Sequence, residues 1–324
     1  MRTVGHTRAA VGRLLERDDA LAALHGSLAE ARAGSGRLAL VAGEAGVGKT
    51  ALVRTFSASV GHAARVLEGA CDALFTPRPL GVFADVAAET GGPLADVVAG
   101  EAAAHDVLAA VRAELDTGCT VLVLEDLHWA DEATLDVVRL LGRRVEGLAA
   151  LVIATYRDDE LERDHPLRIV LGELATARGV VRVRLEPLSA AAVAQLADGY
   201  EVDVDELYRH TSGNPFFVTE ALEAECEEIP ATVRDAVLAR TARLGPEART
   251  VVEAVSVAPP HMEPWLLEAA CGEHAAAAEE CLASGVLGVT GAGIAFRHEL
   301  ARLAIEQSLP PGRRLALHRR LLAA

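Results

Sequence analysis

Eight consecutive residues, Gly43-Glu44-Ala45-Gly46-Val47-Gly48-Lys49-Thr50, fit the pattern GxxxxGK(S/T) and constrain the fold more than any other segment. In this pattern glycines let the backbone turn tightly, so that consecutive N–H groups face inward around an anion. The pattern requires a strand before it and a helix after it. The apolar run 37–42 and the helical run 50–59 meet both requirements. The sequence therefore favours a nucleotide phosphate loop over a glycine-rich turn.

Lys49 is the only lysine of the chain, because 30 of the 31 Lys and Arg residues are arginines. A lysine ammonium is compact, whereas an arginine carries a wide planar fork. A phosphate wrapped by backbone N–H groups leaves room for the compact group. We therefore expect Lys49 to reach the β- and γ-phosphates, Thr50 to hold Mg²⁺ and all eight loop residues to bind nucleotide.

Strand and helix patterns alternate from residue 37 to about residue 187. Short apolar runs of this kind are typical of strands buried on both faces of a parallel sheet. The chain is therefore predicted to be an α/β protein with a parallel P-loop NTPase sheet. The expected strands are 37–42, 64–69, 119–125, 149–155 and 180–185, and the expected helices are 14–33 (capped by Asp18 or Asp19), 50–59, 101–116, 131–145 and 165–177.

An acidic pair, Glu125-Asp126, ends the apolar run 120–124 about 75 residues after the phosphate loop. In P-loop NTPases one such carboxylate orients Mg²⁺ and the other positions the attacking water. The usual order assigns Glu125, with Thr50, to Mg²⁺ and assigns Asp126 to the water. A Glu in the first place departs from the commoner Asp, so the sequence leaves open which acid does which.

The next expected strand ends in Thr155-Tyr156-Arg157. Its carboxyl end should lie beside the phosphates, where open α/β sheets bind ligands. An arginine fork pairs with phosphate oxygens, so Arg157 is a candidate catalytic sensor of the γ-phosphate. The alternative is a surface arginine in the charged run 157–160.

After Pro187 the pattern becomes helical, with one two-strand signal at 286–290 and 294–298 around Gly291-Ala292-Gly293. Helices combined with one hairpin indicate a winged-helix module. We therefore expect three parts: a P-loop domain at 1–187, a helical subdomain at 188–229, and a winged-helix-like module with the start of a C-terminal helical region at 230–324. Within them, 189–198, 203–210, 215–228 and 312–324 are expected helices, and 71–81 is an expected loop.

Composition excludes several classes of protein. No apolar run approaches the ~18 residues needed to span a bilayer, so no membrane association is expected. The five cysteines form no CxxC pair, which fits reduced thiols and a cytoplasmic location. A net charge of −16 argues against direct nucleic-acid binding by this chain.

Several segments together resemble the STAND class of signal-transduction ATPases, and this resemblance implies an AAA+/STAND-like sheet. Within that class the chain is similar to the N-terminal ATPase of large LuxR-type transcriptional regulators. The segments are Val11-Gly12-Arg13, the phosphate loop, Leu124-Glu125-Asp126-Leu127-His128-Trp129-Ala130-Asp131, Ala154-Thr155-Tyr156-Arg157 and Gly213-Asn214-Pro215-Phe216-Phe217, and the likeness continues through Ile229–Arg234 and Ala295–Leu300.

The resemblance implies further nucleotide contacts. Val11 and Arg13 would border the adenine and ribose, and Pro215 would pack on the base. His298 resembles a winged-helix histidine that touches the β-phosphate of ADP, although a lone histidine is more often structural. Trp129 is interpreted as a packing residue.

The resemblance implies an ATP-binding, slowly hydrolysing switch that uses Mg²⁺ and self-associates in the ATP state. The sensor repeats and DNA-binding region of such regulators would lie outside this chain. The alternatives are a scaffold that holds nucleotide without hydrolysing it, and a P-loop ATPase with a substrate of its own. Arg143 and Arg144 are candidates for an arginine finger acting in trans, or are simply solvated.

Overall fold

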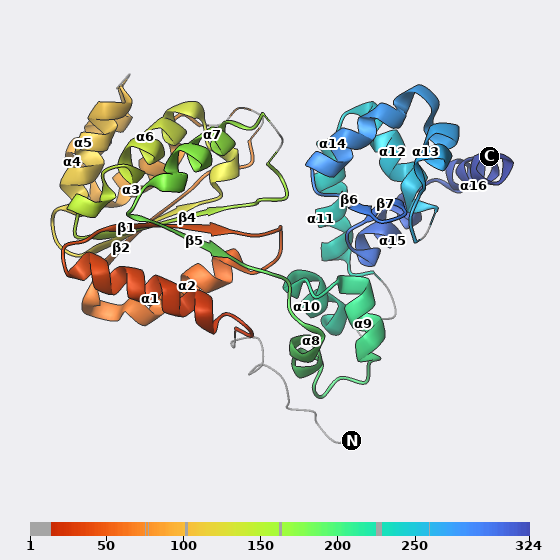
Figure 1. Ribbon diagram of the computed structural model, residues 1–324, viewed down its shortest axis with the longest axis horizontal. Coiled ribbons are helices and arrows are strands. Elements are labelled where there is room, and N and C mark those ends of the chain that lie inside the picture. The colour runs from red at the N-terminus through yellow and green to blue at the C-terminus, as the bar shows by residue number, and fades with distance from the viewer. Residues whose placement is uncertain are drawn as a thin grey trace. The chain divides into compact units, whose positions relative to one another are not determined.

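The computed structural model describes residues 14–74, 76, 78–100, 103–161, 164–224, 229–258 and 260–324. The described chain divides into two compact units, 14–186 and 187–324, which we call the sheet unit and the helical unit. Figure 1 labels their elements. No helix among the described residues is both long and apolar enough to cross a membrane.

The sheet unit is built on five parallel strands in the order β2-β3-β4-β1-β5. Their bounds are β1 Arg37–Ala42, β2 Arg65–Ala70, β3 Thr120–Glu125, β4 Ala150–Tyr156 and β5 Val180–Arg184. The predicted strands are thus confirmed to within a residue or two. Leu40 and Leu124 both lie level with Ala154, so β1, β3 and β4 end at one edge of the sheet.

Helices cover both faces of this sheet (Figure 1). On one face lie α1 Asp18–Arg32 and α2 Lys49–Val60, and on the other lie α3 Gly81–Thr90, α4 Gly92–Val98, α5 Ala104–Leu115, α6 Glu132–Gly142 and α7 Pro166–Glu173. Short 3₁₀ helices occur at Gly61–Ala63, Val145–Gly147, Leu174–Thr176 and, after β3, Leu127–Trp129 (η2).

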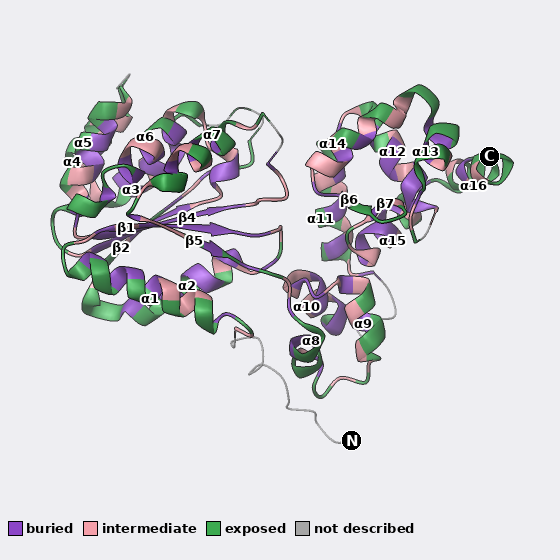
Figure 2. Ribbon diagram, in the orientation of Figure 1, coloured by how far each residue is buried: buried purple, intermediate pink, exposed green. Residues whose placement is uncertain are grey.

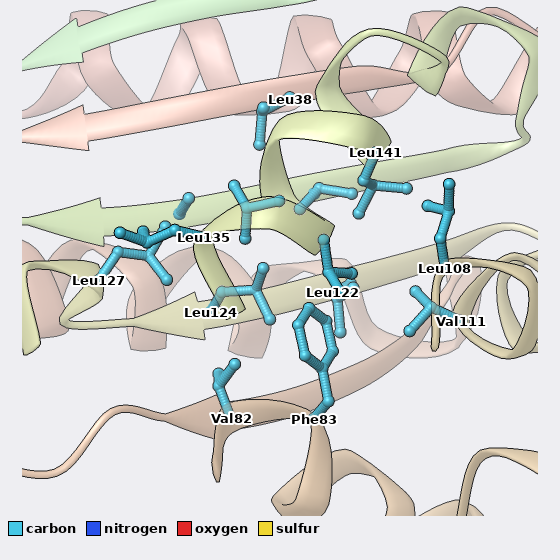
Figure 3. Packing of buried hydrophobic residues seen from close by; sticks show 14 of the residues in the cluster. Leu38, Val82, Phe83, Leu108, Val111, Leu122, Leu124, Leu127, Leu135 and Leu141 are labelled. Carbon is cyan, nitrogen blue, oxygen red and sulfur yellow. The ribbon is translucent and has the colours of Figure 1, made fainter. Parts of the chain in front are cut away.

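The central strands β1, β3 and β4 are buried on both sides, as Figure 2 shows for the centre of the sheet, whereas the edge strands β2 and β5 are partly exposed. Alternate side chains of β1 enter two different cores: Ala39 and Val41 pack with α1 and α2, while Leu38 and Leu40 pack with the opposite layer. In the second core Phe83 of α3 lies against Leu122 and Leu124 of β3 (Figure 3).

Two expectations about this unit need correction. The helix expected from residue 14 begins at Asp18, and its N-cap is Arg17 rather than Asp18 or Asp19. The two aspartates occupy the first turn, where their charges favour the helix dipole. Helices α3 and α4 follow the loop expected at 71–81 and had no predicted counterpart, because Gly91, Gly92 and Pro93 interrupt the pattern.

The helical unit contains the expected hairpin of β6 Leu287–Thr290 and β7 Gly293–Phe296, which pair antiparallel. Met262 forms a bridge with Ile294 beside it. The helices are α8 Ala190–Leu196, α9 Val204–Thr211, α10 Pro215–Glu223, α11 Ala231–Ala242, α12 Pro246–Ser256, α13 Pro264–Cys271, α14 Ala278–Ala283, α15 Glu299–Ser308 and α16 Pro311–Ala323, with a 3₁₀ helix at Gly272–Ala277. Polar side chains at Ser189, Asp203 and Asn214 cap α8, α9 and α10.

Candidate functional site

The phosphate loop lies between β1 and α2, as its flanking patterns predicted. Gly48 is the N-cap of α2 and has a φ of 103°, a conformation that glycine adopts without strain. A Cβ at Gly43 would stand 2.8 Å from the Leu185 carbonyl oxygen, so this turn has no room for a side chain. The first turn of α2 therefore points its N–H groups toward the loop, an arrangement that favours anions.

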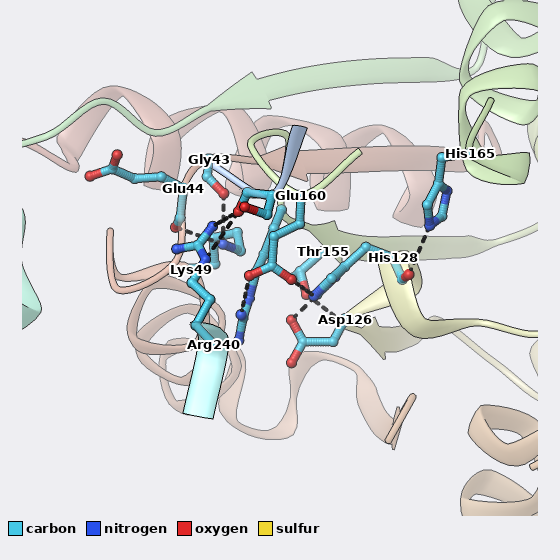
Figure 4. Close-up of polar contacts among 11 residues, drawn as sticks. Gly43, Glu44, Lys49, Asp126, His128, Thr155, Glu160, His165 and Arg240 are labelled. Atoms are coloured by element: carbon cyan, nitrogen blue, oxygen red, sulfur yellow. Dashed lines mark hydrogen bonds and ion pairs between the residues drawn. The ribbon is translucent and has the colours of Figure 1, made fainter. Parts of the chain in front are cut away.

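The Lys49 side chain folds back over the loop (Figure 4). Its Nζ donates to the carbonyl oxygens of Gly43 at 2.8 Å and Glu44 at 3.0 Å. Burial lowers the pKa of Lys49, and the nearby Arg157 guanidinium lowers it further, while Asp126 and other carboxylates oppose that change. The ammonium is thus partly desolvated beside a second cation, which is an environment that favours binding of an anion.

Thr50 and Glu125 meet across the loop and the end of β3. The Thr50 side chain lies close enough to the Glu125 carboxyl to lower its pKa slightly. Burial raises the pKa of Glu125, and repulsion from Asp126 raises it further, whereas Arg54 acts in the opposite direction. A hydroxyl and a carboxylate supply the oxygen ligands that Mg²⁺ prefers. No cluster of three metal-binding side chains occurs within the described ranges, so Mg²⁺ here would take its other ligands from nucleotide and water.

Asp126 turns the chain out of β3 with a φ of 58°. Its backbone N–H donates to Thr155 Oγ1 at 2.9 Å, which joins the end of β3 to the end of β4. Burial raises the pKa of Asp126, and Arg157 and Lys49 oppose this rise. The structure therefore brings Lys49, Asp126 and Arg157 together although they are far apart in sequence.

Arg157 is held by two contacts within the same unit. Its Nη1 donates to Glu160 Oε1 at 2.6 Å, and its guanidinium carbon lies 4.7 Å from the centroid of the Trp129 ring. Trp129 also lies against the His128 ring, with 4.4 Å between centroids. Trp129 thus packs on the arginine, so its interpretation as a packing residue fits its position.

Arg17 is a site-adjacent residue that the sequence analysis missed. The residue is 5% exposed. Its Nη2 donates to the Val47 carbonyl in the phosphate loop at 3.1 Å and to the Glu186 carbonyl at the end of the sheet unit at 2.8 Å. Burial lowers the pKa of the guanidinium. Nothing in the local sequence around Arg17 marks these two carbonyls as its partners.

In the helical unit His298 and the turn before Pro215 lie together. The His298 Nδ1 is 3.1 Å from the Thr211 carbonyl oxygen, and its ring is 4.7 Å from the Phe217 ring. Ser212 Oγ also donates to the Arg297 carbonyl at 3.1 Å. Two of the four residues that the resemblance assigns to nucleotide, Pro215 and His298, thus lie in the same part of this unit.

The remaining predicted residues lie elsewhere. Val11 and Arg13 fall outside the described residues. Arg143 and Arg144 follow the C-terminal end of α6, whereas the N-terminal end of that helix follows η2 and the acidic pair. Arg143 Nη2 pairs with Glu173 at 2.9 Å, and both arginines are exposed.

Comparison with known proteins identifies an ATPase domain and a similar fold. Residues 13–154 match the family model described as AAA ATPase domain. A Walker-type ATPase of Pyrococcus abyssi matches with a TM-score of 0.61 and 14% identity, over 90% of this chain and 96% of that chain. The Orc1 protein of Aeropyrum pernix, solved in complex with DNA, matches with a TM-score of 0.51 and 15% identity, over 93% and 94%.

A STAND protein with a tetratricopeptide repeat sensor from Pyrococcus horikoshii also matches, with a TM-score of 0.40 and 16% identity, over 92% of this chain and 44% of that chain. Likeness at that score does not bear on the STAND assignment. No curated protein matches the chain. The chain therefore contains an AAA-type P-loop ATPase domain, and its finer assignment is a matter for proposal.

Proposed function

We propose that the chain is the ATP-binding switch of a STAND-type signal-transduction ATPase, the ATPase module of a LuxR-type transcriptional regulator. The observation that carries the proposal is the convergence of Lys49, the Thr50–Glu125 pair, Asp126 and Arg157 at one edge of the parallel sheet. The loop follows β1, the two acids lie at the end of β3, and Arg157 follows β4. Phosphoryl transfer to water requires groups of these kinds.

The proposal assigns a role to each residue. Lys49 and the loop N–H groups would hold the β- and γ-phosphates, and Thr50 with Glu125 would hold Mg²⁺, which would neutralise phosphate charge. Asp126 orients the attacking water, and Arg157 contacts the γ-phosphate. The raised pKa values of Glu125 and Asp126 fit acids whose charge is to be balanced by a cation.

We further propose that the helical unit distinguishes bound ADP from bound ATP. Its hairpin and following helix α15 act as a winged-helix module, and His298 and Pro215 contact ADP in the resting state. Exchange for ATP releases this closure and permits self-association. Shifting such an equilibrium from 1:99 to 99:1 takes about 5.5 kcal/mol of differential affinity. Because the net charge is −16, we propose no direct nucleic-acid contact by this chain, unlike the Orc1 protein solved with DNA.

The first test measures ATP and ADP binding with Mg²⁺ to the purified chain, to Lys49→Ala and to Lys49→Arg. Arg32→Ala, in an exposed position on α1, is the control. Binding lost in both Lys49 variants and kept in the control is expected. Equal binding by Lys49→Ala and the unaltered chain would refute the nucleotide role of the loop.

The second test separates the switch from a scaffold. Asp126→Asn should keep ATP affinity and lose hydrolysis, because a neutral amide cannot orient the attacking water as a charged carboxylate does. Turnover is expected to be slow, below the range of about 1–100 s⁻¹ typical of kinases. A chain that binds ATP but shows no turnover before or after the substitution would be a nucleotide-binding scaffold.

A further inference from the structure

His128 lies between Asp126 and Glu160 beside the candidate site (Figure 4). Its side chain is only 1% exposed. Nδ1 lies 3.8 Å from Asp126 Oδ1, and Nε2 lies 3.6 Å from Glu160 Oε2. The two carboxylates belong to different segments, one after β3 and one after β4. The imidazole therefore spans the gap between these two segments.

Glu160 connects this imidazole to Arg157. One carboxylate oxygen of Glu160 faces His128, and the other accepts the 2.6 Å hydrogen bond from Arg157. The main chain at His128 is also fixed, because its carbonyl oxygen lies 3.0 Å from His165 Nε2. A continuous row of polar groups thus runs from Arg157 through Glu160 and His128 to Asp126.

Burying an imidazole costs free energy unless polar groups lie beside its nitrogens. An apolar side chain would fill this space without that cost. The carboxylates that face the two ring nitrogens are both acceptors, so whichever nitrogen carries hydrogen, it faces a carboxylate. The ring is therefore suited to keeping Asp126 and Glu160 at a fixed separation. Apolar packing alone does not explain this arrangement.

We propose that His128 is a positioning residue that couples Arg157 to Asp126. The proposal rests on the ATPase function proposed above. When a γ-phosphate draws Arg157 away, Glu160 loses that partner and is held by His128. His128 then keeps Asp126 in the orientation that directs water at the phosphate. The residue acts through Asp126 and does not itself touch the nucleotide.

The test compares steady-state hydrolysis by the full chain with that of His128→Asn, Glu160→Gln and the double variant. His105→Asn is the matched control, because His105 is 76% exposed on α5. Turnover should fall about 10–100-fold in each single variant, the range seen when partners of catalytic groups are removed, with KM for ATP changed less than about threefold. ADP affinity should stay unchanged, which a merely structural loss would not allow.

The double variant examines the coupling itself. Residues that act through one row give losses that do not multiply, so the double variant should be no slower than the slower single variant. Multiplying losses, turnover within twofold of the unaltered chain, or parallel loss of ADP binding would each overturn the proposal. If His128→Asn fails to fold, Glu160→Gln alone decides, by the same split between turnover and KM.

These outcomes are separate from failure of the proposed function. A chain without turnover, or one whose binding survives Lys49→Ala, contradicts the ATPase assignment itself. A chain that hydrolyses ATP normally after loss of His128 contradicts only the coupling.

Discussion

Arg17 offers the most direct test of how the phosphate loop is anchored. Replacing it with methionine keeps the aliphatic stem and removes the guanidinium that donates to Val47 at 3.1 Å and to Glu186 at 2.8 Å. Each hydrogen bond from a charged donor contributes about 1.5–3 kcal/mol, and both carbonyls lose their donor. Burial lowers the pKa of Arg17, so burying its charge has a cost, and removing the charge offsets part of the lost hydrogen-bond energy. We expect a net loss of about 3 kcal/mol in the free energy of unfolding of the sheet unit.

The measurement can be confined to the sheet unit because the chain has two tryptophans, one in each unit. A Trp265→Phe background leaves Trp129 as the reporter, and Trp265 is 55% exposed, so its loss is mild. Urea unfolding followed by tryptophan fluorescence then gives the free energy of the sheet unit. Arg32→Met, in an exposed position on the same helix, is the control.

The three variants should differ in how much they lower the free energy of unfolding. Arg32→Met should change the free energy of unfolding by less than about 1 kcal/mol, as exposed substitutions do. Arg17→Lys should recover only part of the loss, because one compact ammonium cannot reproduce a planar fork. An Arg17→Met chain as stable as the control would show that the two carbonyl contacts do not anchor the loop.

Three further predictions follow from the same geometry. Glu125→Gln should raise the unfolding temperature without nucleotide while abolishing Mg²⁺-dependent hydrolysis. In the unaltered chain the free energy of unfolding should increase as pH falls from neutrality toward the ordinary glutamate pKa of 4.5, because a carboxyl with a raised folded-state pKa binds its proton in the folded state first. Calorimetry across that pH range with no such gain would contradict this. Gly213→Ala should destabilise the helical unit by about 2–5 kcal/mol in urea unfolding, since its Cβ would stand 2.1 Å from the Leu188 carbonyl oxygen at a φ of +74°. The control Gly199→Ala, at a φ of +90° in open space, should cost only about 1 kcal/mol in the same assay. Asp131→Ala should cost about 1–2 kcal/mol in the same assay on the sheet unit, because Asp131 caps α6 and also accepts from the Leu80 N–H at 3.1 Å; an unchanged midpoint would argue against the cap.

Local sequence signals predicted the parts of the site that depend on neighbouring residues. The loop Gly43–Thr50 could be recognised because its glycine spacing serves a local turn between a strand and a helix. The strands could be placed because continuous apolar runs are required wherever both faces are buried. Periodicity failed at α3 and α4, where Gly91, Gly92 and Pro93 divide two short helices whose positions depend on packing against β2 and β3.

The contacts between distant segments depended on tertiary structure. The order β2-β3-β4-β1-β5 puts the ends of β3 and β4 side by side, which brings Asp126 and Thr155 within hydrogen-bonding distance. Glu160 and Arg17 had no signal in the sequence, because their partners are His128 and Val47, which lie 32 and 30 residues away along the chain. The sequence by itself predicted which residues could hold a phosphate and determined where a buried parallel sheet must run. Only the tertiary structure decided which charged groups meet beside the loop Gly43–Thr50, since the pairing of strands, rather than the spacing of residues, sets their distances.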